Sequence, residues 1–394
     1  MSIQFKRLCA DDIIENIDYF KNCALNLSDY SAAFKIMWQD YFTEYFALVH
    51  NCLVFMEYYQ GRTYFYYPLS MGSAEDEAAA LDEIERYCRE NNVRLHYTSV
   101  PSEKLCAMVK RYGAELRMNN KRRWRDYLYN AQDFVTYGGK KFSGQRNHVN
   151  KFKKLYPQFE FCELNGSNRD EILEFLKEFE RRQLDKGTTI AREELQSVFK
   201  LTDYIDEFAL KAGGIRVDGK LVSYSVGEVC GDQLIIHVEK ALTQYEGIYA
   251  TTAHEFAKHY VTDAIAYINR EDDSGDAGLR KSKLQYNPIE LVDKYTLLPH
   301  RAIDGVSHLP SIVCDRIEIR EITDINANEF YRLEYDVARN RYWGYNWREH
   351  FSGEPTPEYF MRGIREDFKN KDEMPLGIFY DRRLAGEVVL HNFG

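Results

Sequence analysis

The feature that most constrains the fold is an order of predicted elements that occurs twice, about 170 residues apart in the chain. In the first occurrence, apolar runs on both sides of Gly61 predict a hairpin, which precedes an amphipathic helix and a strand at 93–100. In the second, Asp218-Gly219 predicts a tight hairpin, a further turn at Gly231-Asp232 corresponds to the turn at Gly61, and a helix and a strand at 264–269 follow. Two units that each mix hairpins, helices and strands predict an α/β (α+β) chain of two similar halves.

A third unit of the same kind is predicted in the last part of the chain. The polar stretch 299–311, which contains proline and glycine, separates this unit from the rest. A strand, a helix near 326–340, a second helix and a hairpin with its turn at Asp381 follow. We therefore expect a first unit over 1–134, a second unit over 135–300 and a truncated third unit over 312–394.

The composition is that of a globular protein, with 44% hydrophobic and 29% charged residues. No apolar run approaches the roughly 18–20 residues of a membrane-spanning helix, and the N-terminal segment lacks the apolar core of a signal peptide. The eight cysteines are scattered without the spacing of a zinc site, so we expect reduced thiols and no metal. These features predict a cytoplasmic protein.

Three blocks of the sequence resemble one known family. They are YGGKKFSGQRNHVNKFKKLYP at 137–157, HVEKA at 237–241 and NREDDSGDAGLRKSKLQYNP at 269–288. The blocks are similar to the phosphatidylglycerol lysyltransferase C-terminal-like domain family, which has a tandem fold of two units like the Gcn5-related N-acetyltransferases (GNAT). The resemblance extends over roughly the first 300 residues. In the last segment, NRYWGYNWRE and GEVVLHNFG resemble the opening half of a GNAT domain.

The resemblance implies an acyltransferase. Better-known members of the family transfer an aminoacyl group from aminoacyl-tRNA to a lipid headgroup or a peptide amine. We therefore expect an aminoacyl or acyl group to move from a carrier, either a tRNA acceptor stem or acyl-coenzyme A, to a small-molecule or peptide amine or a headgroup. Two alternatives stay open: an acetyl-coenzyme A-dependent N-acetyltransferase, and a non-catalytic module that binds RNA or another ligand.

The segment 117–154 is strongly basic, although the whole chain has a net charge of −10: the segment holds eleven Lys or Arg and two Asp. Such a segment is typical of a surface that follows phosphates in RNA or in a phosphorylated small molecule, and equally of a solvated helix face. Its candidates to stack on bases are Trp124, Tyr127, Tyr129 and Phe142. Its candidate carrier-binding residues are Lys141, Arg146, Asn150 and Lys151.

The run QYEGIYA lies between a predicted strand and a predicted helix. GNAT enzymes carry Q/R-x-x-G-x-G/A at this place, where backbone N–H groups hold the pyrophosphate of coenzyme A. Gln244 and Gly247 match this pattern and are candidate carrier-binding residues, whereas the bulky Tyr249 departs from it. The alternative is a strand-to-helix turn that needs one glycine.

The block HVEKA places His237 and Glu239 on one face of a strand and Lys240 on the other. His237 and Glu239 are candidate general bases that would deprotonate an acceptor amine, and Lys240 is a candidate acceptor-binding residue. The alternative is that the histidine is a hydrogen-bonded structural residue.

The block at 269–288 is dense in charge, with acidic side chains at the predicted end of a strand and basic side chains on the helix that follows. Asp272 is a further candidate base, and Arg280 and Lys283 are candidates to hold a phosphate or carboxylate of the carrier. The candidate acceptor-binding residues here are Arg270, Glu271 and Asp276. The alternative reading of the acidic side chains is that they cap the helix that follows.

Overall fold

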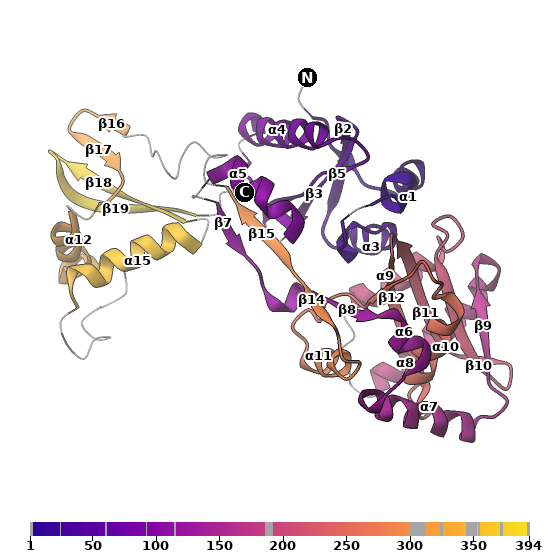
Figure 1. Cartoon of the computed structure of the whole chain (residues 1–394). Coiled ribbons are helices and arrows are strands. Elements are labelled where there is room, and N and C mark those ends of the chain that lie inside the picture. The colour runs from indigo at the N-terminus through magenta and orange to yellow at the C-terminus, as the bar shows by residue number, and fades with distance from the viewer. Residues whose placement is uncertain are drawn as a thin grey trace.

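The computed structural model describes residues 3–23, 25–59, 61–91, 93–113, 116–185, 192–299, 312–323, 326–343, 353, 355–370 and 373–391 (Figure 1). Their strands form three sheets, and helices pack against each of them (Figure 1). No helix in this part of the chain combines the length and the apolar character that a bilayer crossing requires.

The first sheet has the strand order β1-β2-β3-β4-β6-β15-β7, and β5 also pairs with β3. The expected hairpin is β3 and β4, and Ser73 caps the following helix, since its Oγ accepts a hydrogen bond from the Asp76 backbone N–H at 3.2 Å. The elements are β1 (Lys6–Arg7), α1 (Ala10–Glu15), α2 (Ile17–Lys21), η1 (Ser28–Tyr30), α3 (Ala32–Trp38), β2 (Glu44–Val49), β3 (Cys52–Tyr59), β4 (Arg62–Tyr66), β5 (Leu69–Ser70), α4 (Ala74–Asn91), β6 (Tyr97–Pro101), η2 (Ser102–Lys104), α5 (Leu105–Tyr112) and β7 (Arg117–Asn119).

The second sheet has the strand order β14-β8-β13-β12-β11-β10-β9. The turn at Asp218-Gly219 joins β10 and β11 as expected, and both residues have the positive φ that such a turn requires. The elements are η4 (Arg122–Trp124), β8 (Asp126–Asn130), α6 (Ala131–Thr136), η5 (Lys140–Phe142), α7 (Ser143–Leu155), β9 (Glu160–Leu164), η6 (Gly166–Asn168), α8 (Arg169–Asp185), α9 (Arg192–Thr202), β10 (Lys211–Val217), β11 (Lys220–Cys230), β12 (Gln233–Ala241), α10 (Ile248–Tyr260), β13 (Tyr267–Asn269), α11 (Ala277–Leu284), β14 (Glu290–Val292) and β15 (Lys294–Leu298).

A two-stranded ribbon connects the two sheets. One side of the ribbon runs from β7 through η4 into β8, and the other runs from β14 directly into β15. In the first sheet β15 pairs with β7 and β6, and in the second sheet β14 pairs with β8. The boundary expected between 134 and 135 therefore lies after β8, a strand that already belongs to the second sheet.

The two halves also share one hydrophobic core. Buried side chains from β3, β4 and α4 form a single cluster with buried side chains from α8, α9 and β10 to β12. A second cluster surrounds α10 and includes the aromatic residues of β8 and α6. The halves consequently form one body.

The third sheet has the strand order β16-β17-β18-β19 and its own small core (Figure 1). The helix expected near 326–340 is divided in two, because the Asp336 side chain accepts the Arg339 N–H and begins a new helix. Most of NRYWGYNWRE and the end of GEVVLHNFG lie outside the described residues. The elements are β16 (Ile312–Cys314), β17 (Ile317–Arg320), α12 (Ala327–Glu334), α13 (Val337–Trp343), α15 (Pro357–Asn370), β18 (Glu373–Tyr380) and β19 (Arg383–His391).

Candidate active site

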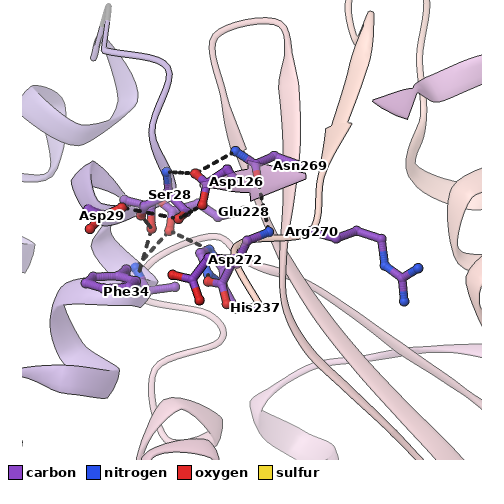
Figure 2. Close-up of polar contacts among 12 residues, drawn as sticks. Ser28, Asp29, Phe34, Asp126, Glu228, His237, Asn269, Arg270 and Asp272 are labelled. Atoms are coloured by element: carbon purple, nitrogen blue, oxygen red, sulfur yellow. Dashed lines mark hydrogen bonds and ion pairs between the residues drawn. The ribbon is translucent and has the colours of Figure 1, made fainter. Parts of the chain in front are cut away.

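A buried cluster of charges lies where the ribbon passes from one sheet to the other. At its centre is Lys294, the first residue of β15, whose Nζ is in ion-pair contact with Asp29. It also lies 2.7 Å from an Asp126 oxygen, 3.9 Å from an Asp272 oxygen and 3.1 Å from the Ser28 Oγ. Figure 2 shows the acidic members of this cluster, which come from η1, from β8 and from the loop after β13.

The charges in this cluster stabilise one another. Burial lowers the pKa of Lys294, but the carboxylates of Asp126 and Asp29 outweigh burial and raise the pKa above its ordinary value. Burial raises the pKa of Asp29, but Lys294 outweighs it and lowers the pKa. Asp126 further accepts hydrogen bonds from the Ser28 N–H at 2.9 Å and from the Asn269 side chain at 3.1 Å (Figure 2). The cluster is therefore ionised and hydrogen-bonded across the interface of the two halves.

Asp272 is the member of the cluster that keeps contact with solvent. Its side chain is 19% exposed, and one of its oxygens accepts hydrogen bonds from the N–H and the hydroxyl of Ser274. Burial raises the pKa of Asp272 to about 6, although Lys294 lowers it. A carboxylate with this proton affinity is ionised at neutral pH and basic enough to take a proton from a reacting amine.

His237 lies on β12 between two glutamates and is fully buried. Its Nδ1 is 2.8 Å from a Glu271 oxygen, and its Nε2 is 3.6 Å from a Glu228 oxygen. Burial lowers the pKa of His237, but these two glutamates outweigh burial and raise it to about 9. Glu228 also accepts the N–H groups of Ala32 and Ala33 in α3. The site therefore holds an imidazolium without exposure to solvent, an arrangement that suits a structural ion pair better than a general base.

Glu239 and Arg270 form an ion pair of 2.8 Å at the place where β12 and β13 separate. Strand β13 is only three residues long, and all of it pairs with the first residues of β12, from Gln233 to Ile235. The pair borders a cavity of about 10 Å³, which α10 closes on the other side. The Nη1 of Arg270 is buried without a hydrogen-bond partner among the described residues, and Figure 2 shows the side chain pointing away from the Lys294 cluster. This guanidinium can therefore receive one further oxygen atom.

Other charged residues of the block at 269–288 fix the conformation of the loop before α11. Asp273 forms a two-bond ion pair with Arg280 and accepts the Tyr127 hydroxyl at 2.6 Å. Lys283 is buried, and its ammonium donates to the backbone carbonyls of Arg270 and Asp272. Burial lowers the pKa of Lys283 to about 8. Lys283 therefore binds the backbone of the loop. This corrects the expectation that its ammonium holds a phosphate of the carrier.

Two candidate acceptor-binding residues have other partners. Asp276 caps α11, since its side chain accepts the Leu279 N–H at 2.6 Å, as the alternative reading proposed. Lys240 forms an ion pair with Glu194. In contrast, the structure brings Glu271 to His237 and Arg270 to Glu239, two pairs that combine predicted site residues.

The candidate carrier-binding residues of the basic segment lie along η5 and α7. Lys141 pairs with Asp133, and Lys151 pairs with Glu246. Arg146 donates to the backbone carbonyls of Tyr137 and Gly139. Asn150 is exposed on α7. The surface therefore keeps only part of its positive charge for a ligand, because several of its cations already have partners within the protein.

The aromatic residues of the same segment do not form a stacking surface together. Tyr127, Tyr129 and Phe142 are fully buried in the core around α10, which corrects the expectation that they face a nucleic acid. Only Trp124 is exposed, at 39% of its surface. Strand β8 is buried on both faces from Asp126 to Tyr129, so Tyr127 and Tyr129 both belong to the core.

The turn that matched the coenzyme A pattern is filled by protein. Gly247 begins α10 with a φ of +87°, and a side chain there would overlap the His148 backbone carbonyl and lie 3.2 Å from the Phe152 Cβ. Helix α7 therefore covers the start of α10, while Gln244 is exposed beside it. A pyrophosphate cannot approach this helix start unless α7 moves.

Three residues that define the charged cluster, Asp29, Asp126 and Lys294, were not among the sequence candidates, and neither was Asp273 in the adjacent loop. The three cluster residues lie far apart in the sequence, and the pairing of β14 with β8 brings Lys294 close to Asp126. A weak signal was present in Asp126, an acidic residue inside the strongly basic segment. Among the described residues, no group of three metal-ligating side chains is present.

Residues 20–298 match the model of the family described as phosphatidylglycerol lysyltransferase, C-terminal. The chain belongs to this family. The predicted α/β, tandem GNAT-like fold is confirmed. The matched region of this lysyltransferase-family chain includes the ribbon, the second half and all of the first half except β1, α1 and the start of α2.

Two solved structures show the same fold. The crystal structure of a conserved protein of unknown function from Bacteroides thetaiotaomicron has a TM-score of 0.68 at 27% identity, over 75% of this chain and 99% of that one. The C-terminal domain of a putative lysylphosphatidylglycerol synthetase from Agrobacterium fabrum has a TM-score of 0.55 at 14% identity, over 74% of this chain and 93% of that one.

A curated relative is an uncharacterised protein of Mycoplasmoides gallisepticum, 27% identical over 177 residues. The match covers 43% of this chain and 54% of that protein, so the chain spans about half the length of this relative.

Proposed function

We propose that this chain is an aminoacyltransferase that moves an aminoacyl group from aminoacyl-tRNA to an amine or headgroup acceptor. Membership of the lysyltransferase family supports this class of reaction. The observation that carries the proposal is Asp272, a carboxyl group with a pKa of about 6 that is partly exposed within an otherwise buried charged cluster. Perturbed carboxyl groups of this kind are typical of catalytic bases.

The reaction consists of an attack by the acceptor on the ester carbonyl of the carrier. A bond forms between the nucleophilic atom of the acceptor, an amine nitrogen or a headgroup hydroxyl oxygen, and the carbonyl carbon, and the bond from that carbon to the ribose oxygen breaks. Asp272 accepts the proton that this nitrogen or oxygen loses and returns it to the leaving ribose oxygen. Two lysines position Asp272. The Lys294 ammonium contacts the Asp272 side chain, and the Lys283 ammonium donates a hydrogen bond to the Asp272 backbone carbonyl.

Arg270 and Glu239 have a binding role in this proposal. The Nη1 of Arg270, which has no hydrogen-bond partner among the described residues, would bind one oxygen atom of the acceptor or of the aminoacyl group. Glu239 fixes the guanidinium through the ion pair. We propose tRNA over coenzyme A as the carrier because α7 covers the start of α10, where GNAT enzymes hold the pyrophosphate.

The experiment compares Asp272→Asn with its neighbour Asp276→Asn in the same loop. The first change removes the base and should lower kcat by about 10²- to 10⁴-fold, as expected for loss of general base catalysis. The second should leave activity unchanged, because asparagine caps a helix as well as aspartate does. Transfer is measured as loss of labelled aminoacyl ester from tRNA in the presence of amines or of phosphatidylglycerol vesicles.

The pH dependence gives a second readout for the same residue. Since the carboxylate is the active form, the wild-type rate should rise as the pH passes through about 6 and level off above it. Equal activity of Asp272→Asn and wild type at pH 7.5 would contradict the assignment of this base.

A further inference from the structure

The turn η4 presents an indole ring to solvent beside the candidate active site. Trp124 is 39% exposed, and the Arg123 guanidinium lies 4.7 Å from the centroid of its ring. The aromatic residues that follow it in β8, Tyr127 and Tyr129, are fully buried. Trp124 therefore differs from its neighbours in offering an aromatic face to a ligand.

Two of the four cations next to Trp124 in the chain, Lys121 and Arg123, have no ion-pair partner among the described residues, whereas Arg122 and Arg125 do. Lys121 and Arg123 are exposed, and no carboxylate among the described residues lies within ion-pair distance of either. This contrasts with Lys141 and Lys151 in the same basic segment, which have acidic partners. An aromatic face flanked by unpaired cations matches a nucleotide, which combines a flat base with a phosphate.

Contacts place η4 against the loop that carries Asp272. Arg122 lies 3.3 Å from an Asp273 oxygen and donates to the Tyr127 hydroxyl at 3.3 Å. Arg123 packs beside Gly275, where a Cβ would lie 3.6 Å from the Arg123 Cδ. A ligand stacked on η4 is therefore adjacent to the loop of the candidate base.

A shallow surface groove, formed by one face of α11, continues from this loop. It is open to solvent, has a volume of about 430 Å³ and is lined by Ala277, Arg280, Lys281, Leu284 and Gln285. Arg280 shares the Asp273 carboxylate with Arg122, so the groove begins next to η4. Lys281 is exposed and has no carboxylate partner among the described residues. Cations thus lie on both η4 and α11, on either side of Asp273.

We infer that Trp124 is the platform on which an unpaired 3′-terminal base of the RNA carrier stacks, while Lys121, Arg123 and Lys281 contact its phosphates. This inference rests on the proposed function, in which the carrier is aminoacyl-tRNA. It specifies the part of the RNA that is recognised: the single-stranded end and not the duplex. Coenzyme A also combines an adenine ring with phosphates, so the experiment has an arm for each source.

The test measures dissociation constants for two RNA probes by fluorescence anisotropy and, in a separate arm, for coenzyme A by isothermal titration calorimetry. One is an uncharged acceptor-stem minihelix with a single-stranded 3′ end, and the other is the same duplex with a blunt end. Trp124→Ala should weaken binding of the tailed probe by about 5- to 150-fold, the range of one base stacked on an aromatic ring, and leave the blunt probe unchanged. Trp124→Phe should retain most of the affinity.

Lys220→Ala provides the matched control, because Lys220 is an exposed lysine in the β10–β11 turn of the same half. It should not alter binding of either probe, whereas Lys281→Ala should weaken both. Thermal melting of each variant verifies that the fold is intact.

The possible outcomes separate the inference from the proposed function. If Trp124→Ala binds both probes like the wild type, or loses affinity for both equally, the platform is wrong while the aminoacyltransferase proposal stands. If the variant loses affinity for coenzyme A but not for RNA, the platform belongs to coenzyme A and the inference is overturned. If the wild type binds neither RNA probe, both proposals fail.

Discussion

Asp272 and Asp273 are adjacent in the chain, yet their surroundings move their proton affinities in opposite directions. Burial raises the pKa of Asp272 to about 6, whereas the Arg280 guanidinium holds the pKa of Asp273 well below its ordinary value. One carboxylate is thereby available for proton transfer, and the other fixes the loop. Carboxyl groups whose environments separate their pKa values in this way commonly have separate roles in a site.

His237 predicts a measurable dependence of stability on pH. Its pKa rises from 6.5 in the unfolded chain to about 9 in the folded one, so its stabilisation is complete below pH 6.5 and is lost as the pH rises to 9. The free energy of unfolding of the wild type, relative to His237→Gln, should fall by on the order of 3 kcal/mol across this window. Urea denaturation at a series of pH values measures this difference.

His148→Gln is the control for this series, since His148 is exposed on α7. It should leave the pH dependence of the wild type unchanged. A constant difference between wild type and His237→Gln from pH 6 to pH 9 would show that the imidazolium does not stabilise the fold.

At the scale of elements, the contact between α7 and α10 decides which ligands the second half can hold. The start of α10 is closed because Gly247 allows the two helices to approach closely. A helix start that faces solvent binds anions through its free N–H groups, and here a neighbouring backbone takes that place. The match of Gln244 and Gly247 to the coenzyme A pattern therefore reflects helix packing.

Gly247→Ala should strongly destabilise the protein. The added Cβ meets the His148 carbonyl, and the φ of +87° is unfavourable for alanine, so we expect a loss of several kcal/mol in the free energy of unfolding. Gly219→Ala separates the two causes, because Gly219 has a φ of +76° but no atom within 4 Å of the added Cβ. Its expected cost is about 1 kcal/mol. Equal melting temperatures for the two variants would disprove the close contact.

At the scale of the whole molecule, Lys294 connects the two halves through buried charges. Asp29 belongs to the first half and Asp126 to the second sheet, and both form ion pairs with this one ammonium group. Removing one partner of a buried ion pair leaves an uncompensated charge in a region that excludes water. The junction should therefore depend on Lys294 more than on any surface ion pair.

Lys294→Met should lower the free energy of unfolding by about 3–5 kcal/mol, because the two carboxylates remain buried without a cation. Lys104→Met removes the more exposed ion pair with Glu77 and should cost less than about 1 kcal/mol. Chemical denaturation of both variants at pH 7 measures the difference. A similar loss for the two variants would mean that the cluster contributes no more than a surface pair.

The parts of the structure that were predictable from the sequence depend on local chemistry. The turn at Asp218-Gly219 and the caps at Ser73 and Asp276 are formed by residues within a few positions of one another. Asp272 could be identified as a candidate from the sequence because it follows a short strand and precedes a helix.

The ribbon and the cluster could not be predicted in the same way. The segments 126–130 and 290–298 are short, and the sheet to which each strand belongs depends on partners more than 100 residues away. The sequence predicts His237 as a base because it shows only the neighbours of this residue along the strand. Glu228 and Glu271, whose carboxylates keep the imidazole charged, come from other elements.

The ribbon also determines how this molecule can be divided. A cut between 134 and 135 would leave β8 on the N-terminal fragment, although it lies between β14 and β13 in the other fragment's sheet, and would leave β15 on the C-terminal fragment, although it lies between β6 and β7. Each fragment would thus carry a strand that completes the other. The two halves resemble a duplicated module. Neither half can be exchanged, transplanted or expressed alone, however, unless the strand that it receives from the other half is included.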